Sequence, residues 1–166
     1  VAFIESICHI PALESKKIIC FNFPEIDDAV FGNYANKVRS SFPFQVRQLN
    51  YVLMELAART PNLNICDIAS IQNKLGRDMM FAPNIYISTE MVLSLDSLPF
   101  IAERVMNIVH AVNGHFKKCL IIDLDNTIWG GVIGDDGLEG IQLGHGLVIG
   151  KAFTEFQMWI KKLKQR

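Results

Sequence analysis

The chain has 166 residues, of which 50% are hydrophobic and 20% charged, and its formal net charge is −1. This composition is typical of a globular protein with enough apolar side chains for a core, and the near-neutral charge argues against nucleic-acid binding. No apolar run reaches the length of a membrane span and no signal peptide is evident, so we expect a cytoplasmic protein that binds no membrane.

Strand-like and helix-like segments alternate in the first part of the chain. Residues 17–23 form an apolar run that predicts a buried strand, ended by Pro24. A helix is expected from Ser41, with Pro43 in its first turn, and residues 63–68 predict a second strand. Strands that alternate with helices indicate parallel α/β layers.

Shorter helical patterns follow the second strand. A helical piece around residues 71–75 ends at Gly76, and residues 77–95 give no clear pattern. A further helix is capped by Asp96 or Ser97 and ends at Gly114.

The cysteines indicate thiols rather than a metal centre. Cys8, Cys20, Cys66 and Cys119 have no zinc-type spacing, and Cys20 and Cys119 lie inside apolar runs. We expect buried free thiols, as in a cytoplasmic protein.

The most informative segment is an apolar run, residues 117–124, that predicts a third strand and ends in Asp123 and Asp125. Side chains at i and i+2 of an extended segment point to the same side, so the two carboxylates are expected to converge. Adjacent carboxylates repel unless a cation lies between them, and Mg²⁺ prefers such oxygen ligands. The pattern predicts a Mg²⁺-assisted phosphoryl-transfer site with an aspartate nucleophile. The alternative is an acidic turn after the strand, in which Asp125 and Asn126 are ordinary turn residues and Thr127 caps a helix.

Glycines dominate the segment after the two aspartates, and a last helix follows them. Seven glycines lie between residues 130 and 146, a pattern that predicts a tight turn and a small hairpin beside the site, or else a loop without a gating role. Trp129 either packs in the core or lines the pocket, and His145 either contacts a phosphate or is solvated. The last helix, from about Leu147, carries an apolar stripe that we interpret as core, formed by Ala152, Phe153, Phe156, Trp159, Ile160 and Leu163.

Residues 123–137 resemble the first motif of the haloacid dehalogenase (HAD) superfamily. The Trp-Gly-Gly-Val-Ile-Gly extension of residues 129–134 is similar, more narrowly, to the FkbH-like branch, called HAD phosphatase subfamily IIIC. Ile128 stands where that branch usually has Leu, and Asp135 where Glu is usual.

The resemblance implies a role for each residue of the motif. Asp123 attacks phosphorus, and Asp125 protonates the leaving oxygen and then deprotonates water. The Asp123 carboxylate and the Asp125 carbonyl bind Mg²⁺, and Thr127 braces the loop. The glycine-rich insert corresponds to the squiggle and flap that cover the substrate. The substrate and phosphate loop comprises Asn126, Thr127, Trp129, Gly130 and Gly131.

Two domains are expected from these patterns. Residues 1–115 resemble a three-layer, parallel-sheet domain of the SGNH-hydrolase type, without a catalytic role of their own, and Gly32-Asn33 is similar to the glycine-asparagine block of those hydrolases. Residues 116–166 resemble the truncated start of a Rossmann-like HAD domain. Because later HAD motifs supply a Ser or Thr, a Lys and further acids, we expect the 166-residue fragment alone to be inactive or nearly so.

Three functions stay open. The first is a Mg²⁺-dependent phosphatase or phosphotransferase that acts on a small phosphorylated metabolite through an aspartyl phosphate. The second, implied by the FkbH resemblance, is a glyceryl transferase and phosphatase that loads a carrier-protein thiol, with an acyl-carrier protein as partner. The third is a non-catalytic scaffold.

Overall fold

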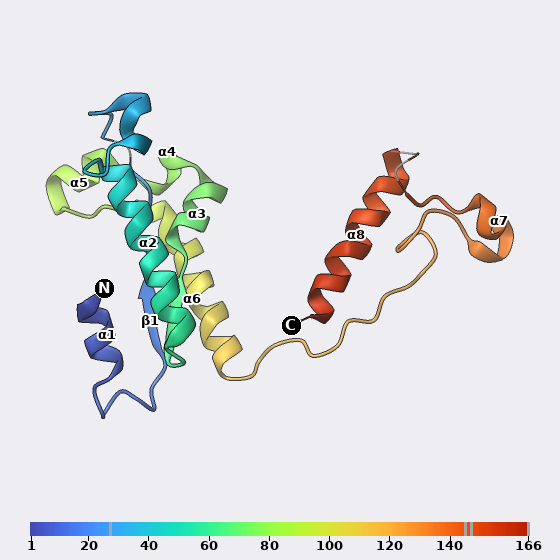
Figure 1. The fold of residues 1–166 in the computed structure, drawn as a ribbon, viewed down its shortest axis with the longest axis horizontal. Coiled ribbons are helices and arrows are strands. Elements are labelled where there is room, and N and C mark those ends of the chain that lie inside the picture. Colours follow the sequence, from blue (N-terminus) through green and yellow to red (C-terminus); the bar gives the residue numbers. More distant parts are fainter. Residues whose placement is uncertain (27, 145, 147, 166) are drawn as a thin grey trace. The chain divides into compact units, whose positions relative to one another are not determined.

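The computed structural model describes residues 1–26, 28–144, 146 and 148–165. The chain divides into two compact units, Val1–Phe116 and Lys117–Arg166 (Figure 1). The expected boundary between residues 115 and 116 lies beside this division. The assignment of the two parts to SGNH-like and HAD-like domains stays a prediction.

The first unit contains a small parallel sheet. Strand β1 (Ile18–Phe21) pairs with β2 (Leu63–Cys66), with Ile18 opposite Leu63 and Phe21 opposite Cys66. Both strands lie inside the ranges predicted from the apolar runs, and the parallel α/β character is confirmed for these two strands. The three-layer arrangement stays a prediction.

Helices make up most of the rest of this unit. The segment 77–95, which showed no sequence pattern, forms two short helices and leads into a 3-10 turn. The elements are α1 (Ala2–Cys8), η1 (Gly32–Lys37), α2 (Phe42–Arg59), α3 (Ile68–Leu75), α4 (Arg77–Met80), α5 (Pro83–Thr89), η2 (Leu95–Ser97) and α6 (Leu98–Val112).

Helix α2 links the two strands and begins at the cap that the sequence predicted. Ser41 has an extended backbone, and its Oγ accepts a hydrogen bond from the Phe44 N–H at 3.3 Å. The same hydroxyl donates to the Ala35 carbonyl at 2.6 Å, which ties η1 to the start of α2. Ser41 is fully buried, so both bonds form away from water.

Two groups of buried side chains form the core of the first unit. One joins α1, α2 and β2 through Cys8, Leu56 and Leu63. The other joins β2, α3, α4 and α6 and comprises Cys66, Ile68, Ile71, Met80 and Ile101. Burying these apolar side chains is what holds the helices against the sheet.

The loop after β1 is fixed to the start of α3 by the buried side chain of Asn22. Its Nδ2 donates to Asp67 Oδ1 at 2.8 Å, and its Oδ1 accepts from the Ile68 N–H at 2.6 Å and the Ala69 N–H at 3.3 Å. Asp67 also caps α3 by accepting from the Ser70 N–H. One amide thus satisfies two of the N–H groups that a helix start leaves without partners.

We expect Asn22→Ala to destabilise the first unit by about 1–3 kcal/mol, because it leaves the Ile68 and Ala69 N–H groups without their acceptor. Urea unfolding of the 166-residue chain measures the change. Asn64→Ala is the matched control, since the buried Nδ2 of Asn64 has no hydrogen-bond partner in the described part of the chain. An equal loss in both variants would contradict this account of Asn22.

The second unit contains α7 (Ile133–Gly140) and α8 (Val148–Lys164). The predicted strand over residues 117–124 is wrong for the described structure, in which this segment pairs with no strand. Ile121 is 93% exposed and Cys119 is also exposed, contrary to the buried positions we expected. The reason is that a strand needs a neighbouring strand for its backbone hydrogen bonds, whatever its own apolar content.

The expected hairpin in the glycine-rich segment is also corrected. Gly130 and Gln142 form one antiparallel bridge, with N–H to carbonyl distances of 3.1 and 2.7 Å, but α7 lies between them. The predicted start of the last helix, Leu147, lies outside the described residues, and α8 begins at Val148. Its apolar stripe is only partly core, because Trp159 is exposed while Phe153 and Phe156 are half-buried.

Burial lowers the reactivity of thiols in the first unit. Cys8 and Cys66 are buried and Cys20 is half-buried. Burial raises the pKa of both Cys20 and Cys66, which disfavours the reactive thiolate.

Within the described residues, no helix combines the length and apolar character that crossing a membrane requires.

Candidate functional site

The predicted site residues lie in one closed loop between residues 123 and 131. Asp125 is the half-buried anchor of this loop. Its Oδ1 accepts hydrogen bonds from Trp129 Nε1 at 3.0 Å and from the Ile133 N–H at 3.2 Å. The carboxylate therefore fixes both the indole and the first residue of α7, and Trp129 is positioned by a polar contact rather than by core packing alone.

A turn at Asn126 closes the loop. Its backbone is left-handed, with φ of 54°, a conformation that Asn tolerates better than most residues. The Asn126 N–H donates to the Gly131 carbonyl at 3.2 Å, and the Gly131 N–H donates to Asn126 Oδ1 at 2.9 Å. The Thr127 and Ile128 N–H groups both donate to the Leu124 carbonyl. These bonds hold the backbone of the loop without any contribution from a ligand.

Asp123 has a different environment from Asp125. It is exposed, and its Oδ1 accepts a hydrogen bond from the neighbouring Leu124 N–H at 2.8 Å. The two carboxylates are thus held by separate donors, one at the surface and one inside the loop. Their convergence on one cation stays a prediction.

The two glycines after Trp129 are required by close packing. A Cβ on Gly130 would lie 2.9 Å from the Phe153 ring, and one on Gly131 would lie 2.8 Å from Asp136 Oδ2. Gly131 also has a positive φ of 99°. The loop therefore packs directly against α8 and the start of α7.

Two supporting residues were missed by sequence reasoning. Asp136 Oδ2 accepts from the Val132 N–H at 2.8 Å, and Gln157 Nε2 donates to the Ile128 carbonyl at 3.0 Å. The acidic first turn of α7 could have indicated Asp136, because acids there bind backbone N–H groups at the helix start. Nothing in the sequence pointed to Gln157, and the suggested phosphate contact, His145, lies outside the described residues.

The donor chemistry of the loop fits Mg²⁺ as a partial ligand set. Magnesium is usually bound by one or two carboxylates, with waters and substrate phosphates completing its shell. Asp123 and Asp125 supply oxygen ligands of that kind. Among the described residues, no cluster of three or more His, Cys, Asp or Glu side chains could hold a metal without such additional ligands.

Comparison with known proteins gives two matches. The family model described as the N-terminal domain of FkbH matches residues 1–110. The chain is also similar to the crystal structure of the N-terminal part of protein BF1531 from Bacteroides fragilis, which is described as containing a phosphatase domain complexed with Mg. The two are 54% identical with a TM-score of 0.84, and the match covers 99% of this chain and 43% of that one. Among curated proteins there is no match.

Proposed function

This chain belongs to the FkbH family, to which its first 110 residues match, and from that premise we propose that the full-length protein is a phosphatase or phosphotransferase. We propose further that it is Mg²⁺-dependent, acts on a small phosphorylated metabolite and forms an aspartyl phosphate on Asp123. The observation that carries the proposal is the loop in which an exposed Asp123 precedes an anchored Asp125. The Mg-complexed phosphatase domain of the similar structure supports it.

Asp123 is suited to the role of nucleophile. Its exposed carboxylate can approach phosphorus, while the bond from Leu124 N–H to Oδ1 orients the group. Attack forms an Asp123–phosphorus bond as the bond from phosphorus to the leaving oxygen breaks. This covalent route divides one difficult displacement into two easier ones.

Asp125 is suited to proton transfer because the loop fixes its position. In its protonated form it would give a proton to the leaving oxygen in the first step. In the second step it would take a proton from the water that attacks phosphorus, so that phosphate leaves and Asp123 is regenerated. A positioned acid and base contributes about two to four orders of magnitude in rate. The hydrogen bonds from Trp129 and Ile133 supply that positioning.

The Asp123 carboxylate and the Asp125 backbone carbonyl would hold the metal ion. When bound, Mg²⁺ supplies charge neutralisation for the phosphoryl oxygens, where electrostatics provides most of the acceleration. The segment from Val132 to Gln142, closed by its bridge to Gly130, would cover the substrate and exclude water.

Membership of the FkbH family also favours the second candidate, in which a glyceryl group is passed to the thiol of an acyl-carrier protein. Incubation of the full-length protein with bisphosphoglycerate and a thiol-bearing carrier distinguishes the glyceryl transferase from the phosphatase. Mass spectrometry of the carrier protein detects whether a glyceryl group has been loaded. Phosphate release without loading of the carrier would exclude the transferase and leave the phosphatase.

Metal removal tests the proposed phosphatase. We expect a chelator to lower phosphate release from small phosphate esters by at least about a hundredfold, since the metal would neutralise the transferring group. Added Mg²⁺ should restore the rate. Ca²⁺ should restore it less, because it binds oxygen ligands at longer distances and does not impose the octahedral arrangement that Mg²⁺ imposes on the reacting groups. An unchanged rate in the chelated protein would contradict the metal-dependent mechanism.

A further inference from the structure

A hollow of about 680 Å³ opens in the first unit and is lined by segments that follow the carboxyl ends of the two strands. Its walls come from the loop after β1, from η1, from α2 and from α3 to α4. The residues that carry the argument are Glu25, Asn33, Arg47, Asn73 and Arg77. We propose that this hollow binds a small molecule with a carboxylate or phosphate group, held by Arg77. The proposal does not depend on the phosphatase activity.

The position of the hollow suits a ligand. In open parallel α/β sheets, ligands bind outside the carboxyl ends of the strands. Glu25 follows β1, and Gln72 and Asn73 lie on the helix that follows β2, so both strands deliver lining residues. Its volume falls within the range of about 300–1,000 Å³ that is common for small-molecule sites.

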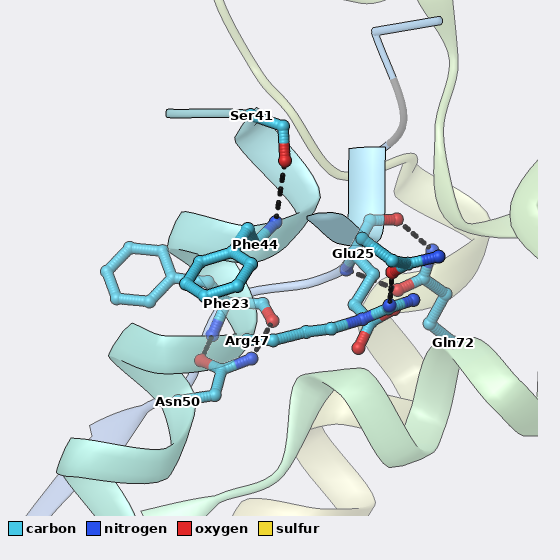
Figure 2. A network of polar contacts seen from close by, with 8 residues as sticks. Phe23, Glu25, Ser41, Phe44, Arg47, Asn50 and Gln72 are labelled. Carbon is cyan, nitrogen blue, oxygen red and sulfur yellow. Dashed lines mark hydrogen bonds and ion pairs between the residues drawn. The ribbon is translucent and has the colours of Figure 1, made fainter. Parts of the chain in front are cut away.

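The loop after β1, which forms one wall of the hollow, is held in place by hydrogen bonds from neighbouring side chains. Gln72 Nε2 donates to the Glu25 carbonyl at 2.7 Å, and the Glu25 N–H donates back to Gln72 Oε1 at 2.8 Å. In the same way Asn50 brackets the backbone of Phe23 with bonds of 2.7 and 2.9 Å. Figure 2 shows these side chains around the loop. With Asn22, three amide side chains hold this short segment, so the hollow keeps its shape without a ligand.

Arg47 forms an ion pair with Glu25, which lies in the same wall of the hollow. Its Nε and Nη2 donate to Glu25 Oε2 at 3.0 and 2.8 Å, and its Nη1 donates to Asn36 Oδ1 (Figure 2). Glu25 and Arg47 therefore compensate each other's charge, although the pair is half exposed and contributes little to stability.

Arg77 is the cation of the hollow for which the described residues supply no counter-charge. It makes no ion pair with any residue that the structure describes. Asn33 and Asn73 line the same hollow with exposed side-chain amides, which can donate to an anion. Since the other charges cancel, the hollow offers one positive charge and neutral donors.

These groups define the chemical class of the ligand. A guanidinium donates two parallel hydrogen bonds to a carboxylate or a phosphate, with charge assistance. Glu25 at the wall disfavours a multiply charged anion close to it. We therefore infer a small, singly anchored anion whose remaining polar groups meet the amides.

The test uses the 166-residue chain and two probes, inorganic phosphate and acetate, at constant ionic strength with chloride as background. NMR follows the Arg77 Nε–H and the side-chain amides of Asn33 and Asn73. We expect saturable shifts of these signals with at least one probe. Saturation with phosphate alone assigns a phosphate ligand, and saturation with acetate assigns a carboxylate.

Arg77→Ala should weaken the binding by at least about tenfold, the loss expected for one charge-assisted contact. Lys74→Ala removes the same charge three residues earlier, on α3, and Lys74 lines a different hollow, so binding should change less than about twofold. Arg77→Gln serves as the second variant, because it keeps a polar side chain of similar length. Shifts that do not saturate with either probe, or equal effects of Arg77→Ala and Lys74→Ala, would overturn the proposal.

Discussion

Asp123→Asn is expected to lower phosphate release by the full-length protein by at least about three orders of magnitude, because an amide is a poor nucleophile and a poor metal ligand. The carboxylate is exposed and makes one backbone hydrogen bond, which an amide oxygen can also accept, so the variant should fold. Phosphate release under saturating substrate, compared with the unchanged protein, measures the effect.

A matched control and an intermediate-trapping variant sharpen this experiment. Glu155→Gln removes one carboxylate charge from an exposed residue of α8, outside the loop and outside the segment that would cover the substrate, and should leave the rate within about twofold. With an aryl phosphate, whose leaving group needs little protonation, Asp125→Asn should slow mainly the hydrolysis of the aspartyl phosphate, so that phosphorylated protein accumulates and is detected by mass spectrometry. Unchanged turnover in Asp123→Asn would instead favour the non-catalytic scaffold.

Leu56→Ala is expected to cost the first unit about 2–5 kcal/mol of unfolding free energy. Leu56 is 1% exposed and packs with Cys8 and Leu63, so the truncation loses buried apolar area and leaves a cavity among α1, α2 and β2. Urea unfolding followed by circular dichroism measures the loss.

Met54→Ala is the control for Leu56→Ala, because Met54 lies on the same helix and is 56% exposed. We expect it to change stability by less than about 0.5 kcal/mol, as is usual for surface positions. If both variants lost equal stability, helix propensity rather than core packing would be the cause.

Local signals explain what the sequence could predict. The apolar runs at residues 18–21 and 63–66 became β1 and β2 because each has the other as a partner. Helix α2 begins at Ser41 because the capping hydroxyl and Pro43 act within one turn. The placement of Asp125, Asn126 and Gly131 in one closed loop also follows from their short spacing along the chain.

Contacts between residues far apart in the chain explain which features the sequence could not predict. Residues 117–124 have the composition of a strand but pair with no strand among the described residues, and composition carries no information about which strand would pair with them. The support from Gln157 crosses almost thirty positions, and the hollow beside Arg77 gathers residues from four elements. Such arrangements depend on how elements pack, which local periodicity does not encode.

The largely exposed apolar stretch at residues 119–122 affects how the molecule behaves in solution. An unpaired apolar backbone is a template for intermolecular β-pairing and aggregation. Charged residues flank it on both sides, with Lys117 and Lys118 before it and Asp123 and Asp125 at its end. Such flanking charges act as gatekeepers against self-association. The two aspartates would then keep the polypeptide colloidally dispersed, in addition to any part in chemistry.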